Sequence, residues 1–156
     1  MFYVLCIAIV AGIVALDQVV KALICANIAV GETMSFLPGV MHLTQLHNEG
    51  AAFSILVGQR WPLILLTFVY LAVVVILIAK KVLRRRSELI SLAVVTGGAI
   101  GNLIDRIAHG YVVDMFALDL FQFPVFNVAD IFVVCGGIAF CIAFLLPNKS
   151  EARHDR

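Results

Sequence analysis

The chain has 156 residues, of which 63% are hydrophobic and 13% are charged, and its mean hydropathy is +1.08. Soluble globular domains carry about 45–50% apolar and about 25% charged residues, so this composition excludes an ordinary soluble domain and indicates a membrane protein. The formal net charge of +1 gives no overall field that would attract nucleic acid, so we expect no nucleic-acid partner.

Four stretches are long and apolar enough to cross a bilayer, which takes about 20 mostly apolar residues in a helix. They cover residues 2–24, 61–79, 89–105 and 128–146. Pro147 ends the last stretch. We therefore predict an all-α membrane protein with four transmembrane helices, formed by a single integral-membrane domain over residues 1–156.

The first stretch is predicted to be a retained helix rather than a cleaved signal peptide. It has no basic region before the apolar run, and Asp17 interrupts that run. Leu23-Ile24-Cys25 faintly resembles a lipoprotein cleavage site, but Ile24 is too bulky for the small residue expected there. The four cysteines lack metal-site or disulfide spacing and are expected to be small buried apolar side chains; they are Cys6, Cys25, Cys135 and Cys141.

The lysine and arginine residues predict the orientation of the helices. Eight of the eleven lie in the loop 80–88 and the tail 147–156, so we expect both segments to face the cytoplasm. With four spans, the N-terminus then lies on the same side. The connections 26–60 and 105–127 are expected to face outward.

The first outer connection contains more than linker sequence. Residues 33–46 combine short apolar stretches with some alternation of apolar and polar residues, which predicts one or two short strands at the membrane surface. We expect a small periplasmic β-sheet and a short surface helix in this connection. Trp61 and Pro62 mark the outer interface and the start of the next helix.

The polar residues in and next to the spans gather at one depth. A charged residue inside a span costs roughly 2.5–3.5 kcal/mol on insertion scales and usually marks function. Under the predicted topology all of them lie near the outer leaflet, and the inner halves of the spans stay apolar. These residues are Asp17, Lys21, Asn48, Asn102, Asp105, Arg106, Asp114, Asn127 and Asp130.

Local structure offers an alternative explanation for some of these residues. Asp17 and Lys21 are four residues apart and share one helix face, so they could be a local ion pair. Asp105 and Arg106 could neutralise one another in the same way. The Gly-x-x-x-Gly spacing over residues 97–101 allows a close approach between helices and could serve packing alone.

A purely structural role is easier to assign to Asp130 than to Asp114. Asn127-x-x-Asp130 is typical of a helix capping box, so Asp130 is either a capping acid or a catalytic group. Asp114 lies in an apolar segment, residues 111–116, without an obvious local cation, and we interpret it as functional. Asp119 has similar neighbours and is the weaker candidate.

If Asp114 and Asp130 meet, they form a pair of carboxylates in a medium of low dielectric constant. Two such groups cannot both ionise easily, so one pKa rises and the pair shares a proton. The ionised member can take a proton from water while the other donates one, which permits amide hydrolysis without a metal. The same pair could carry protons or sodium ions in a transporter.

Other catalytic chemistries lack their motifs. The histidines show no HExxH pattern, and we expect no metal site; they are His42, His47, His109 and His154. There is no GxSxG motif for a serine hydrolase. A small ion transporter would need polar residues across the whole membrane depth, and a membrane adaptor without enzymatic activity would tolerate Asp114→Asn.

Five motifs, in order along the chain, resemble those of bacterial lipoprotein signal peptidase, also called signal peptidase II. Each motif alone is weak evidence, but the five touch three spans and both outer connections. They are Asp17-Gln18-x-x-Lys21, Asn48-x-Gly50-Ala51-Ala52-Phe53, Gly97-Gly98-Ala99-x-Gly101-Asn102-Leu103-x-Asp105-Arg106, Val112-Val113-Asp114 and Phe126-Asn127-x-Ala129-Asp130.

The resemblance implies an intramembrane aspartic endopeptidase of the bacterial inner membrane, with both termini cytoplasmic and the active site near the outer leaflet. Its substrates would be prolipoproteins carrying a diacylglyceryl group, cut on the N-terminal side of the modified cysteine. It implies Asp114 and Asp130 as the catalytic pair. No cofactor is expected, membrane lipid is the surrounding partner, and we expect a monomer. The residues implied to support the site or bind substrate are Asp17, Lys21, Asn48, Gly50, Asn102, Arg106 and Asn127.

Overall fold

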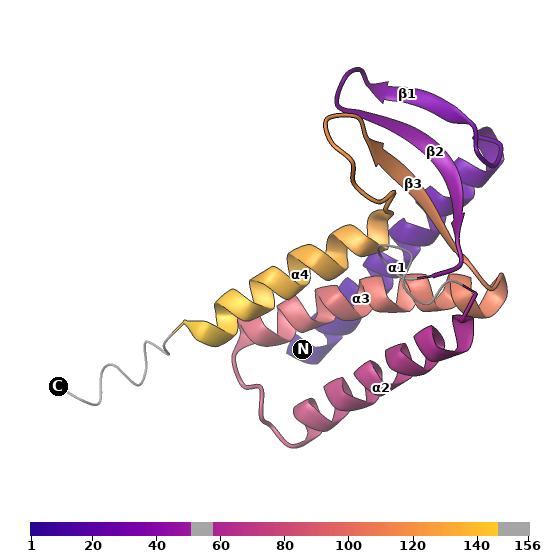
Figure 1. The fold of residues 1–156 in the computed structure, drawn as a ribbon. Coiled ribbons are helices and arrows are strands. Elements are labelled where there is room, and N and C mark those ends of the chain that lie inside the picture. The colour runs from indigo at the N-terminus through magenta and orange to yellow at the C-terminus, as the bar shows by residue number, and fades with distance from the viewer. Residues whose placement is uncertain (51–57, 147–156) are drawn as a thin grey trace.

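The computed structural model describes residues 1–50 and 58–146, which form four long helices and a small sheet (Figure 1). All four helices are long and apolar enough to cross a membrane, as predicted. The elements in chain order are α1 (Phe2–Asn27), β1 (Thr33–Leu37), β2 (Met41–Asn48), α2 (Arg60–Ala79), α3 (Arg86–Ala108), β3 (Val112–Leu118) and α4 (Val128–Leu145).

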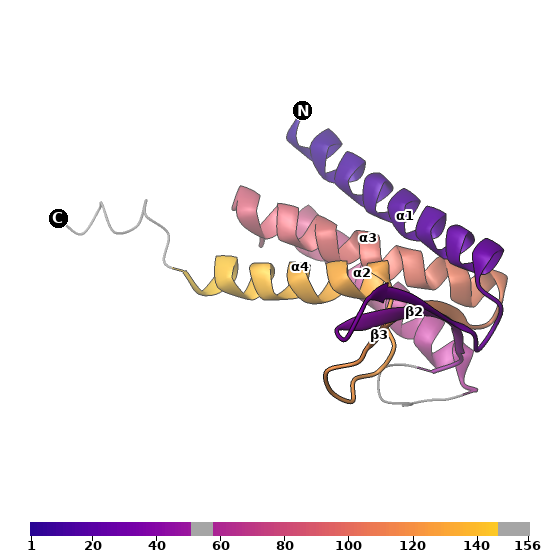
Figure 2. The same ribbon diagram turned by 90° about the horizontal axis from the view of Figure 1, so that it is seen from above.

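Helix α3 lies at the centre of the bundle and contacts α1, α2 and α4 (Figure 2). Its glycines allow these approaches, since an added Cβ at Gly97 would meet Ile13 of α1 at 2.8 Å, and one at Gly98 would meet Val133 of α4 at 2.8 Å. At Gly101 the nearest atom would be a carboxylate oxygen of Asp17, at 2.6 Å. The glycines therefore serve helix packing and also bring the polar residues of α1 and α3 together.

The outer surfaces of the helices are apolar and exposed, as lipid-facing surfaces require. The prediction of four buried cysteines is wrong: Cys25, Cys135 and Cys141 are exposed and Cys6 is half-buried. The error has a physical reason, because a small apolar side chain is as favourable against lipid as against protein. Burial inside the protein therefore cannot be inferred from apolar character in a membrane helix.

The sheet has the order β1-β2-β3, with both pairs antiparallel, and lies at one end of the helix bundle (Figure 1). The strands β1 and β2 confirm the strand prediction for the first connection. The third strand, β3, comes from the second connection and was not predicted. Its register pairs Leu46 with Asp114 and Asn48 with Val112, after a one-residue shift in β2. Asn48 and Asp114 consequently share one face of the sheet.

Two predicted segments fall wholly or partly outside the described residues. The described part of the first connection contains β1 and β2 and no helix, and residues 51–57 lie outside the description, so the expected surface helix remains a prediction. The tail from 147 to 156 also lies outside it.

The end of the bundle opposite the sheet has its own polar contacts. Glu88, buried in the first turn of α3, accepts hydrogen bonds from the backbone N–H groups of Arg84 and Arg85 at 3.3 and 3.2 Å. The Arg85 guanidinium donates to the carbonyl oxygen of Ala143, at 2.9 Å, in the last turn of α4. These contacts connect the α2–α3 loop to the end of α4, far from the sheet (Figure 1).

Candidate active site

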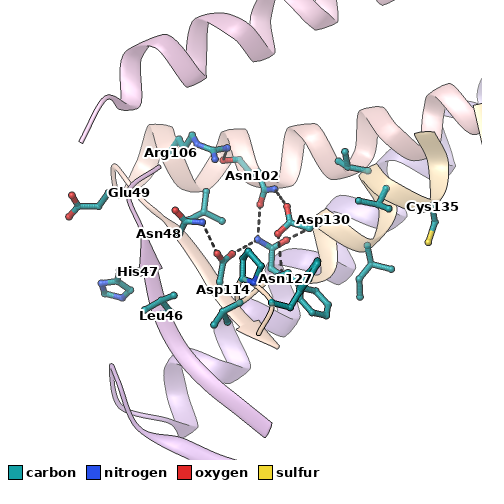
Figure 3. A pocket seen from close by; sticks show the side chains of 18 residues that line it. Leu46, His47, Asn48, Glu49, Asn102, Arg106, Asp114, Asn127, Asp130 and Cys135 are labelled. Carbon is teal, nitrogen blue, oxygen red and sulfur yellow. Dashed lines mark hydrogen bonds between the residues drawn. The ribbon is translucent and has the colours of Figure 1, made fainter. Parts of the chain in front are cut away.

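Four elements bring polar side chains together where the sheet meets the helices (Figure 3). Asp114 comes from β3, Asp130 from the first turn of α4, Asn102 from α3 and Asn48 from the end of β2. Asp114 is 1% exposed, so its carboxyl group is removed from bulk solvent. The two aspartates that the sequence singled out therefore belong to one cluster, although 16 positions separate them in the sequence.

Asn127 connects the two carboxylates. As the N-cap of α4, its side-chain oxygen accepts the backbone N–H of Asp130 at 2.9 Å, and the Asp130 carboxylate accepts the backbone N–H of Asn127 at 3.2 Å. This is the predicted capping box. The Asn127 amide nitrogen then donates to Oδ1 of Asp114 at 2.6 Å. Capping and site formation are not alternatives here, because the cap holds Asp130 beside Asp114.

The remaining carboxylate oxygens also accept from neutral amides. Asn102 Nδ2 donates to Oδ1 of Asp130 at 2.8 Å, and Asn48 Nδ2 donates to Oδ2 of Asp114 at 2.8 Å. Each oxygen of the pair thus has a hydrogen-bond donor, and none of these four donors is a cationic group. Hydrogen bonds from neutral amides orient both carboxylates without neutralising them with a paired cation.

This environment raises the pKa of Asp114 from its usual value to about 6. Burial is the main cause, and the nearby charge of Asp130 acts in the same direction. The hydrogen bonds from Asn48 and Asn127 and the positive charge of Lys21 lower the pKa but do not cancel the effect of burial. A carboxyl with a pKa close to the working pH is suited to both giving and taking a proton.

Both carboxylates line a cavity of about 900 Å³ (Figure 3). One side of the cavity is polar and is formed by the cluster itself together with Arg106. The other side is apolar and is formed by α4 and by the segment before it. The apolar residues on this side are Phe123, Pro124, Val125, Phe126, Ile131, Val133 and Val134. The cavity therefore places an apolar wall beside two carboxylates, a combination that fits an amphipathic ligand.

A buried group of charged side chains, formed by Lys21, Asp17 and Asp105, contacts the cluster through Asn102. Lys21 pairs with Asp17 at 2.9 Å, which is the local ion pair that the sequence offered as an alternative, and also with Asp105 of α3 at 2.8 Å. The alternative of a local Asp105–Arg106 pair is therefore wrong. Arg106 instead donates to the Gly50 carbonyl oxygen at 3.1 Å, because adjacent residues on a helix point in different directions.

Two residues of this group were absent from the predicted site. Asp105 is 2% exposed and accepts the backbone N–H of Val113 at 3.2 Å. Gln18 donates to Asp105 at 2.9 Å. Their positions in the sequence carried a usable signal, because both belong to the quoted motifs and Asp105 lies one turn from Asn102.

Asp119 lies away from the cluster. It is exposed and pairs with His42 at 2.6 Å, a contact that connects the end of β3 to β2. His47 stacks on Tyr111 with ring centroids 3.8 Å apart. Within residues 1–50 and 58–146, no group of three His, Cys, Asp or Glu side chains could hold a metal ion.

Comparison with known proteins gives a consistent result. A family model described as signal peptidase (SPase) II matches residues 9–146. A protein named lipoprotein signal peptidase from Lactococcus lactis subsp. lactis (strain IL1403) is 41% identical over 145 residues, covering 93% of this chain and 95% of its own length. A protein of the same name from Enterococcus faecalis (strain ATCC 700802 / V583) is 42% identical over 138 residues, covering 88% and 86%.

Solved structures agree with the sequence relatives. A bacterial membrane enzyme determined by the in meso method at 2.3 Å resolution superposes with a TM-score of 0.84 at 31% identity, covering 90% of this chain and 87% of that one. A second, at 1.9 Å resolution, has a TM-score of 0.82 at 30% identity, covering 92% and 94%.

The raised pKa of Asp114 predicts a pH-dependent stability. Between about pH 4 and 6 the Asp114 carboxyl is protonated in the folded protein and ionised in the unfolded chain. The resulting contribution to the free energy of unfolding is fully present below about pH 4 and is lost as the pH rises through 6. Between pH 5 and 7 this loss amounts to about 1 kcal/mol. Thermal unfolding in detergent should show Asp114→Asn gaining stability relative to wild type over this interval.

The control for this prediction is Glu49→Gln, which removes an exposed carboxylate from the rim of the same cavity. Its melting temperature should follow the wild-type pH dependence. If the curves of Asp114→Asn and wild type run parallel from pH 5 to 7, Asp114 does not hold a proton in the way described.

Proposed function

The chain belongs to the signal peptidase II family, and on that premise we propose that Asp114 and Asp130 are its catalytic pair. The protein is an aspartic endopeptidase of the bacterial inner membrane that removes signal peptides from prolipoproteins. The transporter and adaptor alternatives are set aside, because the relatives across nearly the whole chain are named as peptidases.

The observation that carries the proposal is the bridge through Asn127. One side chain contacts the Asp114 carboxylate and caps the helix turn that carries Asp130, so the two acids are held in one cluster at the wall of the cavity. The amide donors that surround them leave their charge uncompensated by a paired cation. These are the conditions under which two carboxylates share one proton.

The reaction follows from that shared proton. The ionised member takes a proton from a water molecule, whose oxygen bonds to the scissile carbonyl carbon, and the protonated member donates to the carbonyl oxygen. When the carbon–nitrogen bond breaks, the acid that took the water proton donates it to the leaving nitrogen, and the other carboxylate takes a proton from a hydroxyl of the tetrahedral intermediate. The products are the signal-peptide carboxylate and a new amino terminus, and the pair again holds one proton. Amide N–H donors on the carboxylates keep them oriented throughout.

We further propose that the substrate carries a diacylglyceryl group on the cysteine after the cut. The apolar wall of the cavity, including Ile131 and Val134 of α4, supports this, because acyl chains would lie against it while the peptide meets the carboxylates. Membrane lipid then surrounds the entrance. The pair and its four amide donors all come from one chain, so the site needs no residue from a second copy.

The orientation in the membrane is also a proposal. The sheet and the start of α4, which carry the two aspartates, lie at one end of the bundle, and the basic loop between α2 and α3 lies at the other (Figure 1). Since basic loops stay cytoplasmic, the site lies near the outer leaflet and the sheet on the periplasmic side, with both termini cytoplasmic.

Asn48, Gly50 and Arg106 are proposed to contact the substrate peptide. Asn48 and Arg106 line the cavity, and Arg106 holds the Gly50 carbonyl oxygen. Asp17, Lys21, Asn102 and Asn127 support the pair. The sequence also suggests the hypothesis that the first outer connection closes over the substrate, with Asn48 and the backbone of residues 50–52 touching the peptide; residues 51 and 52 lie outside the described residues.

Replacing either acid tests the catalytic assignment. Purified Asp114→Asn and Asp130→Asn should each cleave a diacylglyceryl-modified prolipoprotein more slowly by roughly 10²- to 10⁴-fold, because each loses one partner in proton transfer. Cleavage is measured as release of the signal peptide in detergent, and a metal chelator should not change the wild-type rate. Asp119→Asn, a carboxylate outside the cluster, is the matched control and should cleave at the wild-type rate. Near-wild-type cleavage by either pair variant would remove that residue from the mechanism.

A bulky residue at position 48 tests the contact with the peptide. Asn48→Phe removes the donor to Asp114 and fills space in the cavity, so cleavage should fall while the protein remains folded. Asn27→Phe, at the exposed end of α1, is a control of the same size change and should cleave normally. Full activity of Asn48→Phe would show that Asn48 has no part in the reaction.

A further inference from the structure

The two catalytic aspartates share a feature in their backbones. The residue before Asp114 is Val113, whose N–H donates to the Asp105 carboxylate at 3.2 Å. The residue before Asp130 is Ala129, whose N–H donates to the Asp17 carboxylate at 2.9 Å. The residue before each catalytic aspartate thus donates its backbone N–H to a buried carboxylate from another element.

The carboxylates of Asp17 and Asp105 both bind the ammonium nitrogen of Lys21. The ammonium nitrogen of Lys21 lies 2.9 Å from Asp17 and 2.8 Å from Asp105. Lys21 is 4% exposed, and its third contact is with the side-chain oxygen of Asn102 at 3.1 Å. An ammonium group has three N–H donors, so all three are used and none is directed at Asp114 or Asp130.

The third contact also acts on the catalytic pair. Because Lys21 donates to the oxygen of the Asn102 amide, the amide nitrogen of Asn102 must point the other way, toward Asp130, to which it donates at 2.8 Å. A reversed amide would place an N–H group against the ammonium. Lys21, together with the Asn127 amide nitrogen that donates to the same oxygen at 3.1 Å, therefore favours the amide orientation that provides a donor for the catalytic carboxylate.

We propose that Lys21 is a positioning residue, which sets the separation and orientation of Asp114 and Asp130 by binding Asp17, Asp105 and Asn102 at one nitrogen. The proposal rests on the function proposed above and assigns the buried charges a role in it. Lys21 acts on β3 through Asp105, on α4 through Asp17 and on the Asp130 carboxylate through Asn102. It touches neither the catalytic carboxylates nor the cavity.

Stability alone does not account for this arrangement. Buried ion groups are often no more stabilising than well-packed apolar side chains of the same size, so a helix bundle does not need one to fold. This group instead joins α1, α3, β3 and α4 at one level of the structure, beside the catalytic pair. Its backbone contacts end at the residues adjacent to the two acids. A displacement of about 1 Å at a catalytic group can lower the rate by about 10²-fold, so geometry at this level governs turnover.

Two variants separate positioning from folding. Lys21→Met removes all three contacts with little change in side-chain length. Asp105→Asn removes the charge that pairs with Lys21 and one of the two oxygens that accept from Gln18, Val113 and Lys21. It leaves the neutral Asp17–Lys21 pair buried, so it perturbs the fold less than Lys21→Met, which leaves two buried carboxylates without their cation. The matched control is Glu88→Gln, a buried carboxylate at the opposite end of α3 that binds two backbone N–H groups.

The readouts are kcat, KM and the thermal unfolding of each variant in detergent, with rates given per folded molecule. Asp105→Asn and folded Lys21→Met should show kcat lowered by roughly 10- to 100-fold with KM changed by less than about threefold, because the cavity is intact and only the pair is displaced. Glu88→Gln should keep the wild-type kcat, whatever its melting temperature.

Wild-type kcat per folded molecule in Asp105→Asn would overturn the proposal, as would a loss of activity that only follows the loss of folded protein. Asp114→Asn is measured in the same assay. Cleavage by that variant would instead overturn the catalytic assignment, so the two failures are distinguishable.

Discussion

The structure depends on keeping two carboxyl groups together in a site where the Asp114 side chain is buried away from bulk solvent. Ionising both is costly there, and a cation bound directly to them would remove the shared proton on which amide hydrolysis depends. The protein meets this constraint with side-chain and backbone amides, which orient Asp114 and Asp130 without a paired charge. The Lys21 ammonium group donates to the side-chain oxygen of Asn102, and Asn102 in turn donates to Asp130.

The fold is arranged around that cluster. Helix α3 is central because its glycines admit α1 and α4 at close range, and Gly101 leaves the space that the Asp17 carboxylate occupies. The sheet contributes Asp114 and Asn48 from one face, because a one-residue shift in β2 aligns them. The chain between β3 and α4 turns back, with the backbone of Phe116 paired to that of Phe126, so that Asp130 begins its helix beside Asp114.

The sequence predicted the four helices, because long apolar runs have few alternatives in a membrane protein, and it predicted the strands of the first connection from their alternation. It missed β3, since a short apolar segment around Asp114 becomes a strand only when β2 is there to pair with it. The motifs singled out both acids before any geometry was known. The role of Asp105 was missed because its partner, Lys21, lies on another helix, and spacing along one helix suggests only local pairs. Partners that lie on different helices can be identified only from the three-dimensional structure.

The most direct test of the account is a structure of the protein bound to a peptide analogue in which a hydroxyl group replaces the scissile carbonyl. The account predicts that this hydroxyl oxygen lies within hydrogen-bond distance, about 3 Å or less, of one oxygen from each of Asp114 and Asp130. A hydroxyl that contacts only one of these carboxylates, or a peptide bound elsewhere in the cavity, would contradict it.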